Sequence, residues 1–306
     1  MKVLVVGYGS IGQRHVILLK ELGCKVAVVS RRSSDCFPCF SNLTNALTDW
    51  QPNYVVIASR TSEHYEDIKV LITNNFNGSV LVEKPLFDTN IQIPKHNFYR
   101  SAVAYNLRFH PLLKKLKKIL ESALNVVTVT IYVGSYLPYW RSKTDYRTSY
   151  SAHRQAGGGV LRDLSHELDY VLWLFGSWRR LTAQGGKFSS LEIDSDDVYS
   201  ILMETDCCPL VSIHMNYLDK VPRREIFVNT DSHTIHIDLC QNTMKINGDE
   251  EAISLEKDAT YRSEHQVILD LDSNLATLCS FEEARETLFT IEASEQAAIC
   301  HTWIER

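Results

Sequence analysis

The chain opens with a strand, a glycine turn and a helix in direct succession. Residues 3–15 read VLVVGYGSIGQRH, and the four apolar residues that come first form a short buried strand. The pattern Gly7-x-Gly9-x-x-Gly12 follows at once, and helical apolar spacing comes after it. A strand, a glycine turn and a helix in this order are the opening unit of a dinucleotide-binding domain.

Each glycine of the turn has its own task. Gly7 allows the tight turn, Gly9 lets the backbone approach a pyrophosphate, and Gly12 lets the helix pack closely on the strand. The free N–H groups at the start of the helix then face the anion. We therefore expect cofactor contacts along the whole turn, from Gly7, Tyr8, Gly9, Ser10, Ile11 and Gly12.

The second strand predicts which dinucleotide is bound. An acidic residue that binds the ribose 2′-hydroxyl is expected about 20 residues after the glycine motif. This chain has Ser30, Arg31 and Arg32 there instead. A guanidinium pairs well with a 2′-phosphate, and no carboxylate repels it. We expect these residues to favour NADP, with NAD as the other possible cofactor.

The first hundred residues alternate between strand and helix patterns. Further strands are expected at 25–30, 54–59, 80–82 and 101–105, with helical stretches between them, such as 62–73. Alternation of this kind predicts a parallel sheet with right-handed crossovers. We assign residues 1–108 to a Rossmann dinucleotide-binding domain of the α/β class.

The pattern of predicted secondary structure changes near residue 110. A long alternating strand is expected at 125–133, then a loop at 134–156 and a helix from 157–159 to 173–176. Strands joined by turn-like pairs follow, which favours antiparallel pairing. They are expected at 181–188, 197–204, 210–217, 224–230, 234–238 and 243–247, before a last helix at 281–303. We assign residues 109–306 to an α+β domain on a largely antiparallel open sheet.

Composition excludes several classes of partner. The formal net charge of −5 gives no global attraction to nucleic acid. No apolar stretch approaches the roughly 18 residues of a membrane span, and no signal-peptide pattern opens the chain, so we expect a cytoplasmic protein that binds no membrane. Cys36 and Cys39 have metal or redox spacing, but no second pair completes a zinc site, and we expect no metal.

A short motif follows the strand at 80–82. Glu83, Lys84 and Pro85 lie where the carboxyl ends of parallel strands face the ligand. Taken alone, this tripeptide is more typical of a surface turn. It stands, however, in an ordered series with the glycine turn, IASRTSEH at 57–64, LVEKPL at 81–86 and GGGVLRDLSHELDYVLWLFG at 157–176.

This series resembles the Gfo/Idh/MocA (glucose–fructose oxidoreductase / inositol dehydrogenase) family over nearly the whole chain. The resemblance implies that Lys84 lies beside the nicotinamide and the reacting hydroxyl, and that His166 acts as general acid/base. A histidine titrates in the right range to move the hydroxyl proton, and a nearby cation stabilises alkoxide charge. It also places Ser59, Arg60, Thr61, His64 and Glu83, with Lys84, at the cofactor.

The chain departs from the family pattern next to the histidine. An aspartate often stands four residues before it, but here Arg162 is at that position and Asp163 is three before. Asp163 and His166 could share a helix face at this spacing, and we keep Asp163 as a catalytic candidate. Asp169, three residues after His166, is the alternative residue to orient the ring or hold the fold.

The loop at 135–154 is long and rich in aromatic and cationic side chains. Arginines could hold a carboxylate or phosphate and aromatic rings could pack a sugar, while an interface or lid segment is the alternative interpretation. We expect the substrate to contact Trp140, Arg147, Tyr150, Arg154, Asp163 and His166. The resemblance adds Asn106 and Arg108, which match a family segment that often faces the substrate. The loop and helix together resemble a branch associated with nonulosonic-acid and surface-sugar pathways.

The leading hypothesis is an NAD(P)-dependent oxidoreductase that acts on the CH–OH group of a sugar, a nucleotide sugar or a sugar acid. A biliverdin-reductase-like or imine reductase and a non-catalytic dinucleotide-binding sensor are the alternatives. A large sheet with one face free of helices needs a partner for its apolar side, which predicts a homodimer or homotetramer.

Overall fold

The structure is a computed structural model that describes residues 1–31, 37–122, 125–141 and 144–306. The chain divides into two compact units. The first unit comprises residues 1–109 and 257–288, and the second comprises 110–256 and 289–306. Two residues singled out from the sequence, Arg32 and Cys36, lie outside the described residues.

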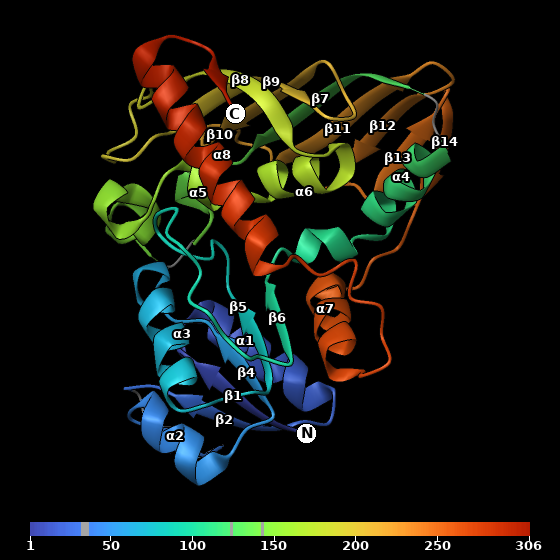
Figure 1. The fold of residues 1–306 in the computed structure, drawn as a ribbon. Helices are drawn as coiled ribbons and strands as arrows, with labels where there is room; N and C mark the ends of the chain where they lie inside the picture. Colours follow the sequence, from blue (N-terminus) through green and yellow to red (C-terminus); the bar gives the residue numbers. More distant parts are fainter. Residues whose placement is uncertain (32–36, 123–124, 142–143) are drawn as a thin grey trace. The chain divides into compact units, whose positions relative to one another are not determined.

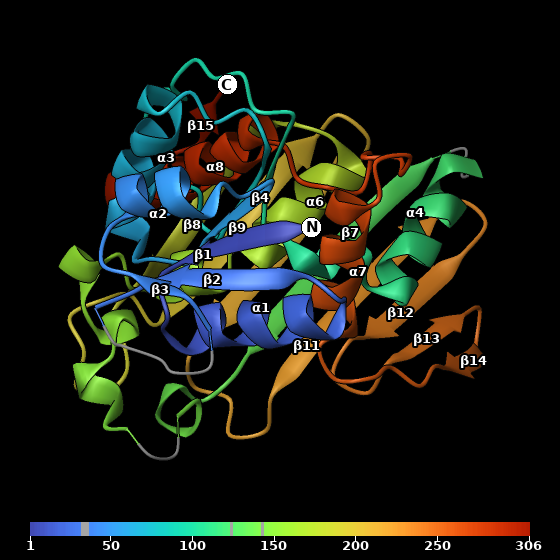
Figure 2. The same ribbon diagram turned by 90° about the horizontal axis from the view of Figure 1, so that it is seen from below.

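Within the described residues, the first unit contains a six-stranded parallel sheet in the order β3-β2-β1-β4-β5-β6. Its strands are β1 (Lys2–Val6), β2 (Lys25–Val29), β3 (Cys39–Phe40), β4 (Tyr54–Ile57), β5 (Ser79–Val82) and β6 (Arg100–Val103). Helices α1 (Ser10–Glu21) and α7 (Ala259–Leu269) pack together on one face, and α2 (Leu43–Trp50) and α3 (His64–Thr73) on the other (Figures 1 and 2). The Rossmann prediction is confirmed.

The register of this sheet brings the strand ends together. Val6 pairs with Val29 and with Ile57, Ile57 pairs with Val82, and Val82 pairs with Val103. Five strands therefore finish on one row, and the residues that follow them share one edge of the sheet. In a parallel sheet this carboxyl edge is where ligands bind.

A segment from near the chain's end completes the first unit. Arg100, nearly buried on β6, donates to the carbonyl oxygens of Val267, Asp270 and Leu271 at 2.8, 2.7 and 2.5 Å. Ile268 joins the hydrophobic core beneath the sheet. The buried guanidinium thus finds charge-assisted partners on the returning segment, which its burial requires.

The second unit is built on a mixed sheet, nine-stranded within the described residues, in the order β14-β13-β12-β11-β7-β10-β9-β8-β15. Its strands are β7 (Val126–Gly134), β8 (Trp178–Gly186), β9 (Val198–Thr205), β10 (Val211–Asn216), β11 (Arg223–Thr230), β12 (Thr234–Asp238), β13 (Thr243–Ile246), β14 (Asp249–Ala252) and β15 (Ile304–Glu305). Strands β7 and β10 pair in parallel, and the other pairs are antiparallel. The predicted α+β class is confirmed.

Helices cover one face of this sheet (Figure 1). Helix α5 (Val160–Asp163) packs on β9 and β10, and Glu167 of α6 (His166–Phe175) pairs with Arg224 of β11 at 2.8 Å. Lys117 of α4 (Pro111–Ser122) donates to a carbonyl oxygen of α6, and Phe289 of α8 (Phe281–Cys300) stacks on Trp178 of β8. Helix α8 ends three residues before the predicted position, and the chain then adds β15.

The prediction of one continuous helix from 157–159 to 173–176 is wrong. The chain forms α5, turns at Leu164 and Ser165, and begins α6 at His166. The turn lets Asp163 bond to Tyr217, which follows β10, while Glu167 pairs with Arg224 of β11. These partners are far away in the sequence, so local apolar spacing does not reveal the break.

The opposite face of the second sheet carries side chains that are exposed to solvent. Phe227 and Val127 are each 39% exposed. Phe227 stacks on His236 of the neighbouring strand, and Tyr132 stacks on His214, with ring centroids 4.2 and 5.0 Å apart. We name this the open face.

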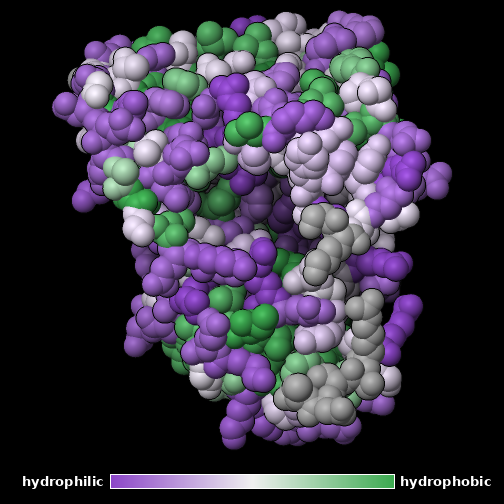
Figure 3. All heavy atoms as spheres, turned by 180° about the vertical axis from the view of Figure 1, so that it is seen from behind, coloured by the Kyte–Doolittle hydropathy of each residue, from purple (hydrophilic) through white to green (hydrophobic). Residues whose placement is uncertain are grey.

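Hydrophilic side chains predominate on the face of the molecule shown in Figure 3, and apolar ones form small groups. Among the described residues, no helix combines the length and the apolar character that crossing a membrane requires.

Candidate functional site

The glycine turn fits the roles expected for it. Gly7 has φ +95°, and a Cβ there would lie 2.4 Å from the carbonyl oxygen of Ala58. A Cβ on Gly12 would lie 2.1 Å from the carbonyl oxygen of Gly7. At Gly9, by contrast, no described atom lies within 4 Å of the position of a Cβ. Two glycines therefore allow close packing, and the third leaves open space beside the backbone.

The same open space lies at the start of α1. Gly9 is the N-cap of this helix, and no described side chain caps its N–H groups. The first turn contains no acidic residue. Unpaired N–H groups and the positive end of the helix dipole make this position suitable for a phosphate or pyrophosphate. The residues present thus fit a dinucleotide.

Two of the residues expected to select the cofactor, Ser30 and Arg31, follow the end of β2. The Ser30 N–H donates to the carbonyl oxygen of Phe40 at 2.9 Å. Arg31 comes next and is exposed. Neither residue is acidic, so no carboxylate at these two positions would repel a 2′-phosphate.

Beyond β4, Ser59 and Arg60 stand at the same edge of the sheet. The Ser59 hydroxyl donates to Asp67 of α3 at 2.6 Å. Burial raises the pKa of Asp67 to about 6. Arg60 precedes a single 3₁₀ turn, Thr61–Glu63, and its N–H donates to the Glu63 carboxylate. These bonds fix the backbone of the segment.

His64 connects this segment to the turn after β5. Its Nδ1 donates to the carbonyl oxygens of Pro85 and Leu86, each at 3.2 Å. Burial lowers the pKa of His64, so the ring is neutral at pH 7. The Glu83 N–H donates to Ile57 at 2.8 Å, and the Lys84 N–H donates to Glu83 Oε2 at 3.2 Å. The Glu83-Lys84-Pro85 turn is therefore held at the carboxyl edge from two sides.

Asn106 and Arg108, predicted to contact substrate, lie inside the first unit. Asn106 donates to Thr260 at 2.6 Å. Arg108 is 1% exposed and pairs with Glu283 at 2.8 Å. Both side chains hold the returning segment 257–288, and their contact with substrate stays a prediction.

In the second unit, Asp163 is the centre of a polar cluster. The carboxylate is nearly buried and accepts a hydrogen bond from the Tyr217 hydroxyl at 2.6 Å. The Tyr150 hydroxyl bonds to it as well, and the nearby Asp163 charge, followed by burial, raises the pKa of Tyr150. Burial, with the Asp163 charge, also raises the pKa of Tyr217. Both phenols stay protonated and act as donors.

His166 lies close to this cluster in the chain but belongs to another helix. Asp163 is the last residue of α5 and His166 is the first residue of α6. The expectation that the two share a helix face is therefore wrong, because the helix breaks between them. His166 is half-buried, and Asp169, one turn further along α6, is buried.

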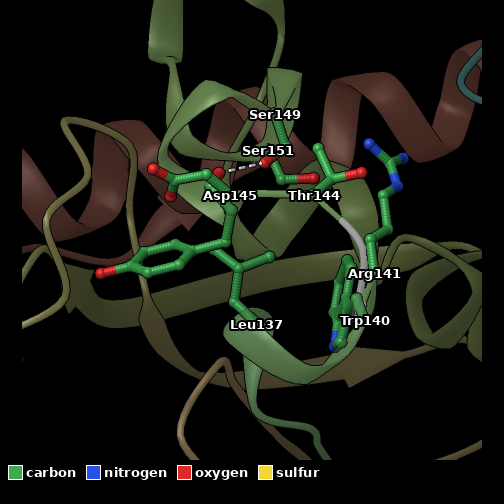
Figure 4. A pocket seen from close by; sticks show the side chains of 8 residues that line it. Leu137, Trp140, Arg141, Thr144, Asp145, Ser149 and Ser151 are labelled. Atoms are coloured by element: carbon green, nitrogen blue, oxygen red, sulfur yellow. Dashed lines mark hydrogen bonds between the residues drawn. The ribbon is translucent and has the colours of Figure 1, made fainter.

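The aromatic loop contributes a second part of the cluster. The Trp140 ring meets the Tyr217 ring edge-on at 5.3 Å, and the Arg141 guanidinium lies over the Tyr150 ring at 5.5 Å. Beside them is a small hollow of about 10 Å³, drawn in Figure 4, which has room for about one water molecule. It is lined by Leu137, Trp140, Arg141, Thr144, Asp145, Tyr146, Ser149 and Ser151.

The other predicted arginines of the loop have carboxylate partners of their own. Arg147 makes a bidentate pair with Asp145, and a further bond to Glu192 at 3.0 Å. The Arg154 N–H donates to Asp194 at 2.7 Å, and its side chain is exposed. The charge of Arg147 is thus partly neutralised, whereas the guanidinium of Arg154 is exposed. Arg154 follows Tyr150 of the cluster closely in the sequence.

Tyr217 is a member of the Asp163 cluster that sequence reasoning missed. It follows strand β10, about fifty residues after Asp163, and carries no motif. The sequence contains one indirect signal, since an aspartate in the middle of an apolar helical pattern needs a buried donor.

We predict that two glycine substitutions in one turn affect different properties, one the stability of the fold and the other cofactor binding. Gly12→Ala forces a Cβ against the Gly7 carbonyl and should lower the free energy of unfolding by about 1–3 kcal/mol. Gly9→Ala should leave unfolding nearly unchanged but weaken NAD(P)H binding, because the methyl group enters the open space. Urea unfolding and cofactor fluorescence titration measure the two effects. Equal stability loss in both variants would contradict this assignment.

A second prediction concerns Asp67. The folded-state pKa of about 6 lies above the ordinary value of an aspartate, about 3.9, so ionisation of Asp67 destabilises the fold as pH rises between these two values. Asp67→Asn should therefore be more stable than the natural chain at pH 8, by about 1–3 kcal/mol, and the difference should vanish near pH 4. Denaturant unfolding across this pH range measures it, with the exposed Asp49→Asn as control. A difference that does not change with pH would refute the prediction.

Comparison with known proteins agrees with this geometry. Residues 1–96 match the Gfo/Idh/MocA family model described as oxidoreductase family, NAD-binding Rossmann fold. Residues 115–254 match the model of the Gfo/Idh/MocA C-terminal domain. A curated relative, an uncharacterized oxidoreductase of Synechocystis, is 29% identical over 163 residues, and these cover 50% of this chain and 42% of that protein.

Solved structures share the fold over the whole chain. Levoglucosan dehydrogenase in complex with NADH has a TM-score of 0.85 at 14% identity, and the match covers 100% of this chain and 98% of that one. The WlbA dehydrogenase from Bordetella pertussis, in complex with NADH and UDP-GlcNAcA, has a TM-score of 0.79 at 15% identity with the same coverage. GenD2 from gentamicin A biosynthesis, in complex with NAD, has a TM-score of 0.79 at 19% identity and covers 100% and 96%.

The two family models together span most of the chain and coincide with its two kinds of sheet. The chain is therefore a member of the Gfo/Idh/MocA family of oxidoreductases, with the NAD-binding Rossmann domain and the C-terminal domain of that family.

Proposed function

We propose that this protein transfers a hydride between a nicotinamide dinucleotide, preferably NADP(H), and a hydroxyl or carbonyl carbon of a sugar, nucleotide sugar or sugar acid. The observation that carries the proposal is the shared row of strand ends in the first sheet. It sets the uncapped glycine turn, the Ser59 segment and the Glu83-Lys84 turn along one edge. The glycine turn, the Ser59 segment and Lys84 are the parts of this edge that would hold a dinucleotide.

Two side chains handle the proton and the charge on the substrate oxygen in this proposal. The bound nicotinamide supplies or accepts the hydride. The His166 imidazole takes the hydroxyl proton during oxidation and returns it during reduction. The Lys84 ammonium donates to the same oxygen and stabilises negative charge that develops there. Glu83 holds the turn rather than acting as a base.

The Asp163 cluster favours a polyhydroxylated substrate. The half-buried Trp140 ring and the exposed Tyr150 ring offer apolar surface for a sugar ring, and the Tyr150 hydroxyl is held by its bond to Asp163. Arg154 is the exposed cation that would suit a carboxylate or phosphate. Structural neighbours bind levoglucosan and UDP-GlcNAcA, which supports a sugar or nucleotide-sugar acid and the surface-sugar branch.

The open face of the second sheet is our proposed homodimer or homotetramer contact. Its exposed Phe227 and Val127, with the aromatic and histidine stacks beside them, form a surface that a second copy would cover.

The mechanism predicts the effect of two alanine variants. His166→Ala and Lys84→Ala should each lower kcat by about 10²–10⁴-fold, because each removes an acid–base or charge-stabilising group, while cofactor affinity falls much less. Oxidation is measured with NADP⁺ and NAD⁺ against a panel of sugars, sugar acids and UDP-sugar acids. Reduction is measured with NADPH and NADH against imines and biliverdin. Exposed Lys95→Ala and His301→Asn are the controls.

Near-natural turnover in both variants would refute the proposed roles. Cofactor binding without turnover on any substrate of the panel would favour the sensor alternative. Loss of cofactor binding in Lys84→Ala would make Lys84 a binding residue.

The proposed preference for NADP(H) predicts that a substitution at Arg31 changes the affinity for one cofactor and not for the other. Arg31→Ala should weaken NADPH binding roughly 10–100-fold, the effect of losing a hydrogen bond to a charged group, and leave NADH binding nearly unchanged. Lys25→Ala, at the other end of the same strand, is the control. Fluorescence titration with both nucleotides measures the ratio of the two affinities. An unchanged ratio would remove Arg31 from the 2′-phosphate site.

The assembly is tested by sedimentation. The natural chain should sediment as a dimer or tetramer at micromolar concentration, and Phe227→Glu should shift it towards the monomer, because a charge enters the open face. Asn229→Glu adds a charge at an exposed polar position of the same strand, so it should dissociate the assembly less than Phe227→Glu does. A monomer of the natural chain at this concentration would contradict the proposal.

A further inference from the structure

Four polar side chains in the first unit form a continuous buried hydrogen-bond chain. The Tyr54 hydroxyl lies 2.9 Å from His265 Nδ1. His265 Nε2 lies 2.8 Å from His15 Nδ1, and His15 Nε2 lies 2.8 Å from Glu83 Oε1. Tyr54 is on β4, His265 on α7 and His15 on α1, while Glu83 follows β5. We call these four residues the histidine chain.

The histidine chain is shielded from water. Tyr54, His265 and His15 are 0% exposed, and Glu83 is 9% exposed. The two imidazole rings meet edge-on at 5.0 Å. The Tyr261 ring lies edge-on to the His15 ring, and the Arg14 guanidinium lies over the Tyr261 ring. A buried chain of this kind must satisfy its own donors and acceptors, since an unpaired polar group is costly there.

The geometry allows one arrangement of protons when both histidines are neutral and Glu83 is ionised. The carboxylate accepts, so His15 carries its proton on Nε2. The bare His15 Nδ1 then accepts from His265 Nε2, and the bare His265 Nδ1 accepts from the Tyr54 hydroxyl. Burial lowers the pKa of His265 far below its ordinary value. Burial raises the pKa of Tyr54. Both effects agree with a neutral His265 ring and a protonated Tyr54 hydroxyl.

We propose that Tyr54, His265 and His15 are positioning residues for the Glu83-Lys84 turn, because their one-way donation fixes the Glu83 carboxylate that in turn accepts the Lys84 N–H. The second oxygen, Oε2, is the acceptor for that N–H at 3.2 Å. The importance of this turn for catalysis rests on the proposed function of Lys84, but the histidine chain itself does not.

The consequence is a connection between distant parts of the sequence. His15 and His265 are 250 residues apart, and the bond between them joins the start of the Rossmann unit to the returning segment. A change at Tyr54, which is not among the expected cofactor contacts, should therefore reach Lys84 through four hydrogen bonds.

The test is NMR of the full chain without cofactor, labelled with ¹⁵N in histidine and lysine. At pH 7, both ring spectra should show neutral imidazoles with the proton on Nε2. Tyr54→Phe removes the first donor and should shift the ring signals of His15, two links away, and the Lys84 amide. Tyr105→Phe, which removes another buried phenol from the same unit, should move these signals much less.

A conservative replacement separates the bond from the packing. His265→Gln retains an N–H donor towards His15 and should keep the Lys84 amide near its natural position, whereas His265→Leu should move it as far as Tyr54→Phe does. A charged ring or a proton on Nδ1 in the natural chain would overturn the proposal. So would a Lys84 amide that does not move in both Tyr54→Phe and His265→Leu.

These measurements need no substrate and no turnover. If Lys84→Ala retains activity while the spectra behave as expected, the proposed role of Lys84 in catalysis fails and the histidine chain stands. If the spectra do not behave as expected, the histidine chain fails and the kinetic test of Lys84 and His166 is unaffected.

Discussion

The alignment of strand ends in the first sheet is the constraint on which the rest of the cofactor unit depends. Parallel pairing gives each strand the same direction, and the register ends them on one row. Each loop then supplies its residues at the same edge. A shift of one strand by one residue would turn its side chains to the other face of the sheet and withdraw its loop. The bonds from His64 to Pro85 and Leu86 tie two of these loops together.

Features of the site that depend on neighbours in sequence could be predicted from the sequence. The glycine turn is one, because backbone conformation and close approach leave few residue types possible at Gly7 and Gly12. The strand before Glu83 is another, since a short apolar run followed by a turn marks the strand end. For the same reason the parallel and antiparallel character of the two sheets followed from the pattern of their strands.

Features that depend on distant partners could not be predicted. The break before His166 follows from the bonds of Asp163 to Tyr217 and of Glu167 to Arg224. Apolar spacing alone describes α5 and α6 as one helix. Likewise, His265 lies in a helix without a motif, and its meeting with His15 exists only in the folded chain. In both cases a buried polar side chain found its partner through tertiary structure, which local patterns do not encode.

The assignment of residues 257–288 to the first unit has a consequence for how the protein is made. Synthesis proceeds from the N-terminus, and a domain can fold as a unit once its residues have left the ribosome. Here the first unit contains residues 1–109 but is complete only after the second sheet's strands β7 to β14 have emerged. Until then, Arg100 and His15 lack the carbonyl groups and the imidazole that they bond to in the finished molecule. The nascent chain thus carries an unfinished nucleotide fold while the strands of the second sheet are being made.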